Sequence, residues 1–353
     1  MLKVVSCPGA WQFSQKMVKH LKRRNPRTTL VQTDFTTFKN TEVKCVLKEP
    51  VRGSDVFIIQ DVANQKMGTV NDNLMTLFTA VDACSHASCE EITVILPTFP
   101  YARQHKKTAR EGLTASMVCR FLEELGVRRV ITLDIHSREI QNSFKRTSLE
   151  NLHASYQIVK RMVDDGVPFE DVTVVAPDTG SISRNTFFAN ALKRPIAMMY
   201  KERDFSKVGK GYYDSNIISQ KLVGEVSSTK VLLTDDMIDT GGTILKASKC
   251  LKDMGADEIY IAASLPFFND PALKDFDTAV CEGNLTRVYG TNAVYNPNLW
   301  RKPWFRMVDI SELFADVIFR VNERISMSEL LNGSEEIYEL FHGEENQDAL
   351  ISE

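Results

Sequence analysis

The 353-residue sequence lacks paired cysteine motifs: its seven cysteines are dispersed, and none forms a Cys-x-x-Cys pair. An odd, scattered set of thiols in a long chain argues against a disulfide framework and is typical of a cytoplasmic protein. The sequence also lacks an apolar run approaching the roughly 20 residues that a membrane helix requires. Its first residues show no basic region followed by a long apolar stretch. We therefore expect a cytoplasmic protein with no membrane association.

A strong excess of charge of either sign is also absent. The formal net charge is −3, which gives no reason to expect nucleic acid as a partner. Its 43% apolar and 25% charged residues are ordinary for globular domains, and its length favours two domains over one. One segment is biased: residues 332–353 contain acidic residues but no lysine or arginine. We expect a solvated acidic C-terminal tail there, and a short helix followed by a disordered acidic end is the alternative.

Short apolar runs rich in valine and isoleucine alternate with helical patterns along the chain. The runs are nearly continuous, which is typical of parallel strands covered on both faces. The sequence therefore predicts an α/β fold of mainly parallel sheets flanked by helices, with ligand loops at the carboxyl ends of strands. The same strand, loop and helix order recurs on both sides of residue 155, which predicts two similar lobes. The predicted strands cover residues 55–61, 91–97, 128–136, 171–178, 195–200, 230–236 and 258–265, and the predicted helices cover 71–86, 114–126, 181–192 and 243–255.

The stretch VLLTDDMIDTGGT, from Val231 to Thr243, carries the strongest chemical signal. A strand leads into the carboxylates Asp235 and Asp236, and Thr-Gly-Gly-Thr opens the following helix. Glycines let a phosphate approach the backbone, and the free amides and dipole of a helix N-terminus favour an anion. Carboxylates accept hydrogen bonds, so sugar hydroxyls or a divalent metal would suit them. The pattern predicts a ribose phosphate ligand.

This stretch resembles the loop that binds 5-phosphoribosyl 1-diphosphate (PRPP) in the type I phosphoribosyltransferase fold. The rest of the chain resembles PRPP synthetase over roughly residues 1–330, and a phosphoribosyltransferase would not need the N-terminal half. Ribose-phosphate pyrophosphokinases transfer the β,γ-diphosphate of ATP to the 1-hydroxyl of ribose 5-phosphate and release AMP, for nucleotide biosynthesis. The segments that resemble this family, in the family's order, are VRGSDVFIIQ (51–60), NDNLM (71–75), FPYARQ (99–104), LDIHSREIQ (133–141) and APDTG (176–180).

The resemblance implies an organisation as well as an activity. It implies an ATP-side lobe over residues 1–155, completed by about 308–330, and a ribose 5-phosphate lobe over residues 156–307, followed by the acidic tail. It also implies a homo-oligomer, either a dimer or a hexamer, whose ATP site is shared between subunits. Mg²⁺ is the implied cofactor, and ATP and ribose 5-phosphate are the implied substrates.

On the ribose side, the resemblance implies that Asp235 and Asp236 hold the 2- and 3-hydroxyls. Asp178 resembles a metal-associated acid near the ribose. Lys201 and Arg203, in YKERDF, match a Lys-x-Arg pair on a mobile loop that stabilises the transition state. The residues implied to cradle the 5-phosphate are Asp239, Thr240, Gly241, Gly242 and Thr243.

On the ATP side, His136 resembles a histidine that reaches magnesium and the ATP phosphates. Arg103 and Gln104 resemble nucleotide-binding residues, and the fixed charge and forked donors of arginine suit polyphosphate. One loop reads FKNTE. The resemblance implies that it comes from a neighbouring subunit and that its residues Phe38, Asn40 and Glu42 contact the adenine base of ATP.

Three features of the sequence depart from the family pattern. Asn40 stands in place of a carboxylate, which predicts weaker discrimination in favour of adenine because an amide both accepts and donates. Thr41 stands in place of a glycine. Arg138 replaces a small polar residue and the segment 107–113 is short, so we expect little dependence of activity on free phosphate.

Two alternatives remain beside an active synthetase. A non-catalytic regulatory subunit could keep the fold while losing the chemistry, but the intact Asp235–Thr243 loop, with His136, Asp178, Lys201 and Arg203, argues for activity. A phosphoribosyltransferase is the third candidate, and the ATP-side motifs argue against it.

Overall fold

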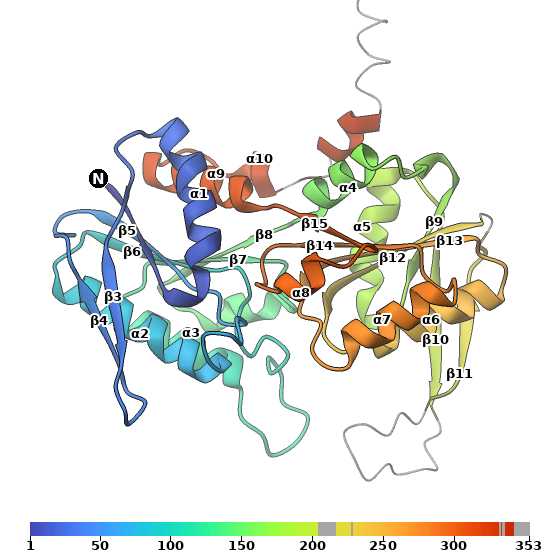
Figure 1. Ribbon diagram of the computed structural model, residues 1–353, viewed down its shortest axis with the longest axis horizontal. Helices are drawn as coiled ribbons and strands as arrows, with labels where there is room; N and C mark the ends of the chain where they lie inside the picture. Colours follow the sequence, from blue (N-terminus) through green and yellow to red (C-terminus); the bar gives the residue numbers. More distant parts are fainter. Residues whose placement is uncertain (204–216, 227–228, 332, 334–335, 342–353) are drawn as a thin grey trace, which may run out of the picture. The chain divides into compact units, whose positions relative to one another are not determined.

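The computed structural model describes residues 1–203, 217–226, 229–331, 333 and 336–341. The chain forms two compact units (Figure 1). Unit 1 contains Met1–Ala154, Asn292–Asn296 and Asp309–Asn332. Unit 2 contains Ser155–Thr291, Pro297–Val308 and the residues from Gly333 on. In the part of the chain that the structure describes, no helix is both long and apolar enough to cross a membrane.

Unit 1 is built on a six-stranded sheet in the order β2-β1-β5-β6-β7-β8. Every pair of neighbours in it runs parallel. Parallel strands between two helical layers are buried on both faces, which explains why their sequences are continuous apolar runs. The strands are β1 (Leu2–Ser6), β2 (Thr29–Leu30), β5 (Asp55–Ile59), β6 (Glu91–Leu96), β7 (Arg129–Leu133) and β8 (Ser148–Leu152).

Helices cover both faces of this sheet (Figure 1). On one face, α1 (Trp11–Arg24) packs against α9 (Ser311–Glu323). On the other face lie α2 (Val70–His86) and α3 (Thr114–Glu124). The start of α2 is fixed by a capping box in which Thr69 and Asp72 exchange side-chain and backbone hydrogen bonds.

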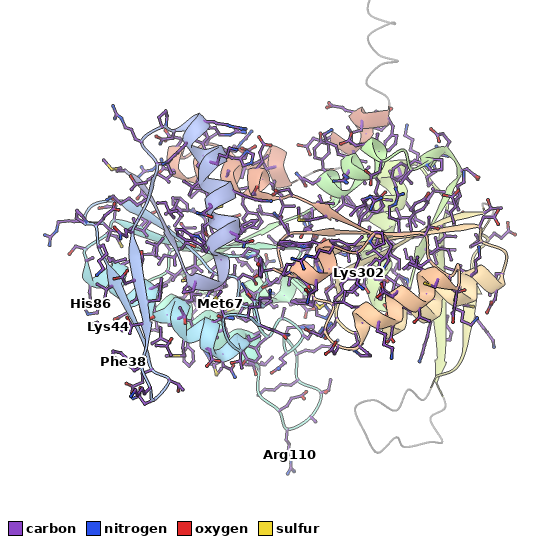
Figure 2. The ribbon with its side chains drawn as sticks, in the orientation of Figure 1. Phe38, Lys44, Met67, His86, Arg110 and Lys302 are labelled. Atoms are coloured by element: carbon purple, nitrogen blue, oxygen red, sulfur yellow. The ribbon has the colours of Figure 1, made fainter. Side chains whose placement is uncertain are left out.

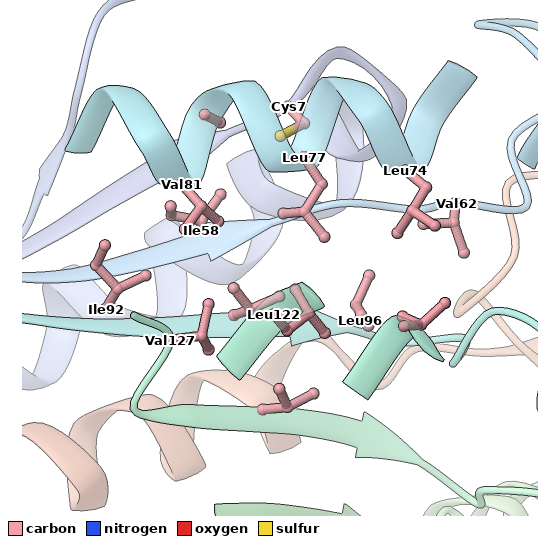
Figure 3. Close-up of a cluster of buried hydrophobic side chains, with 14 of the residues drawn as sticks. Cys7, Ile58, Val62, Leu74, Leu77, Val81, Ile92, Leu96, Leu122 and Val127 are labelled. Carbon is pink, nitrogen blue, oxygen red and sulfur yellow. The ribbon is translucent and has the colours of Figure 1, made fainter. Parts of the chain in front are cut away.

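One hydrophobic cluster of unit 1 lies between α2, α3 and the sheet (Figure 3). Leu77 and Val81 of α2 point toward Ile58 of β5, and all three side chains are fully buried. Burying a side chain of this size stabilises the fold by about 1.5–3 kcal/mol. The layer therefore holds the loops at the strand ends on a rigid support.

A separate two-stranded antiparallel hairpin projects from unit 1. It consists of β3 (Thr33–Thr37) and β4 (Val43–Leu47), with Thr37 paired to Val43 next to the turn. Phe35 and Cys45 pack against the unit 1 core, so the base of the hairpin is anchored while its tip is exposed.

Unit 2 is built on a seven-stranded sheet in the order β11-β10-β9-β12-β13-β14-β15. The sheet is parallel except for the antiparallel pairing of β11 with β10. The strands are β9 (Val172–Ala176), β10 (Ile196–Arg203), β11 (Ile217–Val223), β12 (Lys230–Ile238), β13 (Glu258–Pro266), β14 (Arg287–Thr291) and β15 (Phe305–Val308).

Helices α6 and α7 pack together on one side of this sheet, and α4 contacts β14 and β15. The helices of unit 2 are α4 (Ser155–Asp164), α5 (Ile182–Leu192), α6 (Gly242–Asp253), α7 (Ala272–Cys281) and α8 (Pro297–Trp300); α10 (Ser328–Leu331) belongs to unit 1. Short 3-10 turns are η1 (Pro8–Ala10), η2 (Arg138–Ser143), η3 (Phe169–Asp171) and η4 (Thr179–Ser181).

The α/β fold class and all seven predicted strands and four predicted helices are confirmed. The predicted strand 128–136 is too long, because β7 ends at Leu133 and Asp134 turns into the left-handed region with φ +41°. The predicted strand 230–236 is too short, because β12 keeps its pairing with β13 as far as Ile238.

Part of the acidic C-terminal segment packs against unit 2. Ile337 is fully buried. The rings of Phe341 and Phe169 pack edge to face, with 5.2 Å between their centroids. The ammonium of Lys193 lies 4.4 Å from the centre of the Tyr338 ring. A solvated tail is therefore wrong for residues 336–341, since apolar side chains spaced along this segment have a surface to bury against. Residues 342–353 lie outside the described part.

Candidate active site

The predicted ribose phosphate loop lies where β12 passes into α6. Gly241 caps α6 in the left-handed conformation, with φ +74°. A Cβ at this position would stand 2.3 Å from Cε2 of Phe276, so both the backbone conformation and the space exclude other residues. A Cβ at Gly242 would meet nothing within 4 Å. The space beside the first residue of the helix is therefore open.

The acidic pair lies on the last part of β12. The backbone N–H of Asp236 donates to Oδ1 of Asp235 at 2.9 Å. Burial raises the pKa of Asp235, and the nearby carboxylates of Asp236 and Asp178 raise it further. Buried carboxylates that lie close to one another are stabilised by hydroxyl donors or by a cation.

Asp178 lies at the end of β9, next to β12 in the sheet. Its Oδ1 accepts from the backbone N–H groups of Gly180 at 3.0 Å and Ser181 at 3.2 Å. This capping arrangement fixes the carboxylate at the carboxyl edge of the sheet. Val175 of β9 pairs with Leu233 of β12, so the two predicted ribose-side acids follow the same end of neighbouring strands.

Asn185 supports this cluster, although no motif in the sequence indicated it. The side chain is fully buried in α5. Its Nδ2 donates to the backbone oxygens of Ser181 and Thr234, each at 2.9 Å, and its Oδ1 accepts from the Thr234 N–H at 3.3 Å. The amide ties α5 to the residue before Asp235. Its signal in the sequence is an asparagine on the buried face of a helix.

Asp239 lies at the start of the loop after β12. Its Oδ1 accepts from Nδ2 of Asn269 at 2.8 Å, and its backbone oxygen accepts from the N–H of Asn269 at 3.1 Å. Thr240 is exposed and Thr243 is half-buried. The whole predicted phosphate cradle is thus one continuous segment between β12 and the first turn of α6.

Lys201 and Arg203 are the last predicted ribose-side residues. Their backbone belongs to β10, where Lys201 pairs with Gln220 and Arg203 with Ile217 of β11. Their backbone therefore forms the end of a strand rather than a loop. Their side chains, and residues 204–216 that follow, lie outside the described part of the chain.

The predicted phosphate-side residues of unit 1 come from two loops at the ends of β6 and β7. Arg103 and Gln104 are exposed, and the N–H of Gln104 donates to the backbone oxygen of Tyr101 at 2.8 Å. His136 is exposed after β7, and its ring meets that of His105 edge to face at 5.6 Å. The structure thus adds His105, whose sequence signal, a single histidine beside a motif, is weak.

The predicted base-binding residues lie at the tip of the β3–β4 hairpin. Phe38 is 47% exposed, and its N–H donates to the backbone oxygen of Glu42 at 2.8 Å. Oδ1 of Asn40 accepts from the N–H of Glu42 at 3.3 Å. Thr41 has φ +71°, which explains why glycine suits this position.

Within unit 1, the hairpin tip lies apart from the tip of the loop that follows β6. Figure 2 shows Phe38 at the end of the hairpin, apart from Arg110 at the tip of the loop that follows Arg103. The aromatic ring is therefore available to another molecule.

No group of three or more His, Cys, Asp or Glu side chains suited to a metal ion occurs among the residues that the structure describes. Mg²⁺ is commonly held by only one or two carboxylates, with waters and substrate phosphates completing its shell. The carboxylate of Asp178 has the oxygen donors that such a site uses.

Residues 2–126 match the family described as the N-terminal domain of ribose phosphate pyrophosphokinase, and residues 145–284 match the phosphoribosyl transferase domain. The chain is 33% identical to ribose-phosphate pyrophosphokinase 2 of Enterococcus faecalis over 302 residues, 85% of this chain and 88% of the relative. It is 33% identical to ribose-phosphate pyrophosphokinase of Caldanaerobacter subterraneus over 330 residues, 93% of this chain and 97% of the relative.

Among solved structures, the chain is similar to phosphoribosylpyrophosphate synthetase from Mycobacterium smegmatis. The TM-score is 0.79 at 29% identity, and the match covers 92% of this chain and 99% of the other. The similarity therefore extends over both units.

Proposed function

Because the chain belongs to the ribose-phosphate pyrophosphokinase family, we propose that it makes PRPP. It transfers the β,γ-diphosphate of ATP to the 1-hydroxyl of ribose 5-phosphate and releases AMP. The observation that carries this proposal is the β12–α6 loop, with left-handed Gly241, an open face at Gly242 and an acidic pair at the strand end. These parts suit a ligand with a phosphate at one end and a diol at the other.

In this proposal, the amides at the start of α6 receive the 5-phosphate, where the helix dipole and unpaired N–H groups favour an anion. Asp235 and Asp236 accept hydrogen bonds from the ribose 2- and 3-hydroxyls. The raised pKa of Asp235 supports this role, since a carboxylate poor in solvent gains from hydroxyl donors. Binding both ends of the sugar fixes the direction of its 1-hydroxyl.

Mg²⁺ is the proposed cofactor, and Asp178 and His136 are the residues proposed to bind it. When bound, the ion neutralises charge on the phosphate oxygens during transfer. Asp178 is oriented by two backbone amides that donate to its Oδ1, which supports its role as a positioned carboxylate.

Arg103 and Gln104 are the proposed partners of the ATP phosphates, and Lys201 and Arg203 are proposed to stabilise charge in the transition state. Phosphoryl-type transfer needs mainly positioning and positive charge. Arg103 has a fixed charge and a forked set of donors, and its exposure supports this role.

We further propose a cytoplasmic homo-oligomer in which Phe38, Asn40 and Glu42 of one subunit complete the ATP site of another. The support is the position of Phe38, which is 47% exposed at the end of a projecting hairpin. An exposed aromatic ring on a supported hairpin is suited to stacking on a base. No observation favours the non-catalytic regulatory subunit.

The proposal is tested by calorimetry on the variant Asp235→Ala, Asp236→Ala. We expect loss of ribose 5-phosphate binding with ATP binding preserved, because the acidic pair belongs to unit 2 and the ATP motifs to unit 1. Asp253→Ala, at the exposed end of α6, is the matched control. Parental affinity for ribose 5-phosphate in the double variant would reject the site.

A further inference from the structure

The turn after β7 is held by four consecutive residues at the end of β8. The backbone N–H of Asp134 donates to the backbone oxygen of Leu152 at 2.8 Å. The N–H of Ile135 donates to Oδ1 of Asn151, also at 2.8 Å. In the opposite direction, Oδ2 of Asp134 accepts from the N–H of Ala154 at 3.0 Å. The segment 151–154 therefore acts as a template for the turn.

The turn needs such a template because Asp134 adopts a left-handed backbone conformation with φ +41°. L-residues other than glycine seldom occupy this region, and although aspartate is among those found there most often, the conformation costs free energy that surrounding contacts must offset. Asp134 is also almost fully buried, so water cannot replace a lost partner of its carboxylate.

His153 provides the one donor from a titratable side chain in this template. Its Nδ1 lies 2.8 Å from Oδ1 of Asp134. Because a carboxylate accepts, the contact requires a proton on Nδ1. The imidazole is 29% exposed, whereas the carboxylate is 2% exposed. His153 therefore closes the solvent side of the turn and satisfies an oxygen that is otherwise shielded.

The turn leads directly to His136. Ile135 is buried beside Asp134 and anchors the chain, and the next residue presents its imidazole to solvent and to the ring of His105. A change in φ at Asp134 would redirect His136 two residues later.

We propose that His153 is a positioning residue, which fixes the Asp134 turn and through it aims His136 at the phosphates of the nucleotide. This inference rests on the proposed function for the role of His136. His153 itself need not touch the substrate. The role requires only that residue 153 donate a hydrogen bond from the position of Nδ1.

Two variants distinguish the hydrogen bond donated by His153 from the contribution of its side chain to packing. The side-chain amide of His153→Asn places a donor near the position of Nδ1, whereas that of His153→Gln places it near Nε2. We expect His153→Gln to lower kcat about 10- to 100-fold, as loss of an orienting partner commonly does. His153→Asn should stay within about threefold of the parent, and neither variant should shift KM for ribose 5-phosphate by more than about threefold.

Hydrogen exchange supplies a readout that does not depend on turnover. The amides of Asp134 and Ile135 should exchange faster in His153→Gln than in the parent and in His153→Asn, while peptides from β5 and β6 are unchanged. Equal exchange in both variants, or equal kcat in both, would overturn the proposal. If the parent makes no PRPP, the proposed function fails, and the exchange pattern still decides whether His153 holds the turn.

Discussion

The backbone N–H of Asp236 donates a hydrogen bond to Oδ1 of Asp235 at 2.9 Å and so orients the Asp235 carboxylate. That single hydrogen bond does not offset the burial of Asp235 and the neighbouring negative charges, and its pKa is raised. The ionised form of Asp235 is therefore disfavoured in the free protein, and a ligand that supplies donors or positive charge would stabilise it. Such a conflict between stability and binding is expected at a functional site.

Asp235→Asn should stabilise the free protein and weaken ribose 5-phosphate binding. In the unfolded chain this carboxyl titrates near its ordinary pKa, whereas in the folded chain the pKa is higher. As pH rises between the two values, the unfolded state binds fewer protons, so the parent loses stability. Asparagine does not titrate. The variant's advantage in Tm should therefore be absent at low pH and grow to about 2–4 °C near pH 8.

The measurement is thermal unfolding across pH for the parent, Asp235→Asn and the exposed control Asp253→Asn. A constant difference in Tm across pH, or a variant less stable than the parent at pH 8, would show that Asp235 is not strained by its surroundings.

The variant Gly242→Ala distinguishes an effect on phosphate binding from an effect on the stability of the fold. A Cβ at Gly242 meets nothing within 4 Å, whereas one at Gly241 would collide with Phe276. Alanine also favours helix by up to about 1 kcal/mol over glycine. We expect Gly242→Ala to keep or raise Tm while KM for ribose 5-phosphate increases at least about tenfold, the effect of losing ~1.4 kcal/mol of binding.

Gly241→Ala is the contrasting variant and should lower Tm, because both φ and space oppose a side chain. Steady-state kinetics and thermal unfolding on the two variants decide the matter. Unchanged KM in Gly242→Ala would mean that no phosphate lies against the start of α6.

Thr41→Gly should stabilise the hairpin tip. Thr41 has φ +71°, a conformation that is costly for a β-branched residue and allowed for glycine. After the extra entropy lost by glycine, the net gain should be about 0.5–1 kcal/mol. Urea unfolding measures it, with Thr36→Gly in the regular part of β3 as the control that should destabilise. If both variants lose stability, the turn is not strained at Thr41.

A shared ATP site should allow complementation between two inactive chains. Phe38→Ala removes the exposed ring of the hairpin tip, and Arg103→Ala removes a charge from the phosphate-side loop. If the tip serves a neighbouring subunit, mixed oligomers contain some sites with both residues intact and should recover part of the activity. Activity is measured after refolding the two chains together, with native mass spectrometry to verify mixing. Verified mixed oligomers without recovery would contradict a shared site.

The sequence was informative about strands and about the phosphate loop for the same physical reason. Parallel strands need continuous apolar runs, and an anion site at a helix start needs glycine at particular places; both demands are local. The run from Val231 to Thr243 contains the whole of β12 beyond its first residue and the start of α6, so neighbouring residues in sequence were sufficient.

The supporting residues could not be predicted in this way. Asn185 contacts Thr234, and His153 contacts Asp134, through pairings that exist only after α5 and β8 have packed beside their neighbours. Their sequence signal is one polar residue in an apolar pattern, which many surface positions share. The end of β7 at Leu133 was missed for a related reason, because the left-handed turn at Asp134 is imposed by β8 and not by a local glycine.

The most direct test of PRPP synthesis is ³¹P NMR of the purified chain with ATP, ribose 5-phosphate and Mg²⁺. Transfer of the β,γ-diphosphate as one group predicts AMP and PRPP in equal amounts, and it predicts neither product in the Asp235→Ala, Asp236→Ala variant. A regulatory subunit would give no turnover, and a phosphoribosyltransferase would consume added PRPP without using ATP. Formation of ADP in place of AMP, or no product from a chain that binds both substrates, would contradict the proposed function.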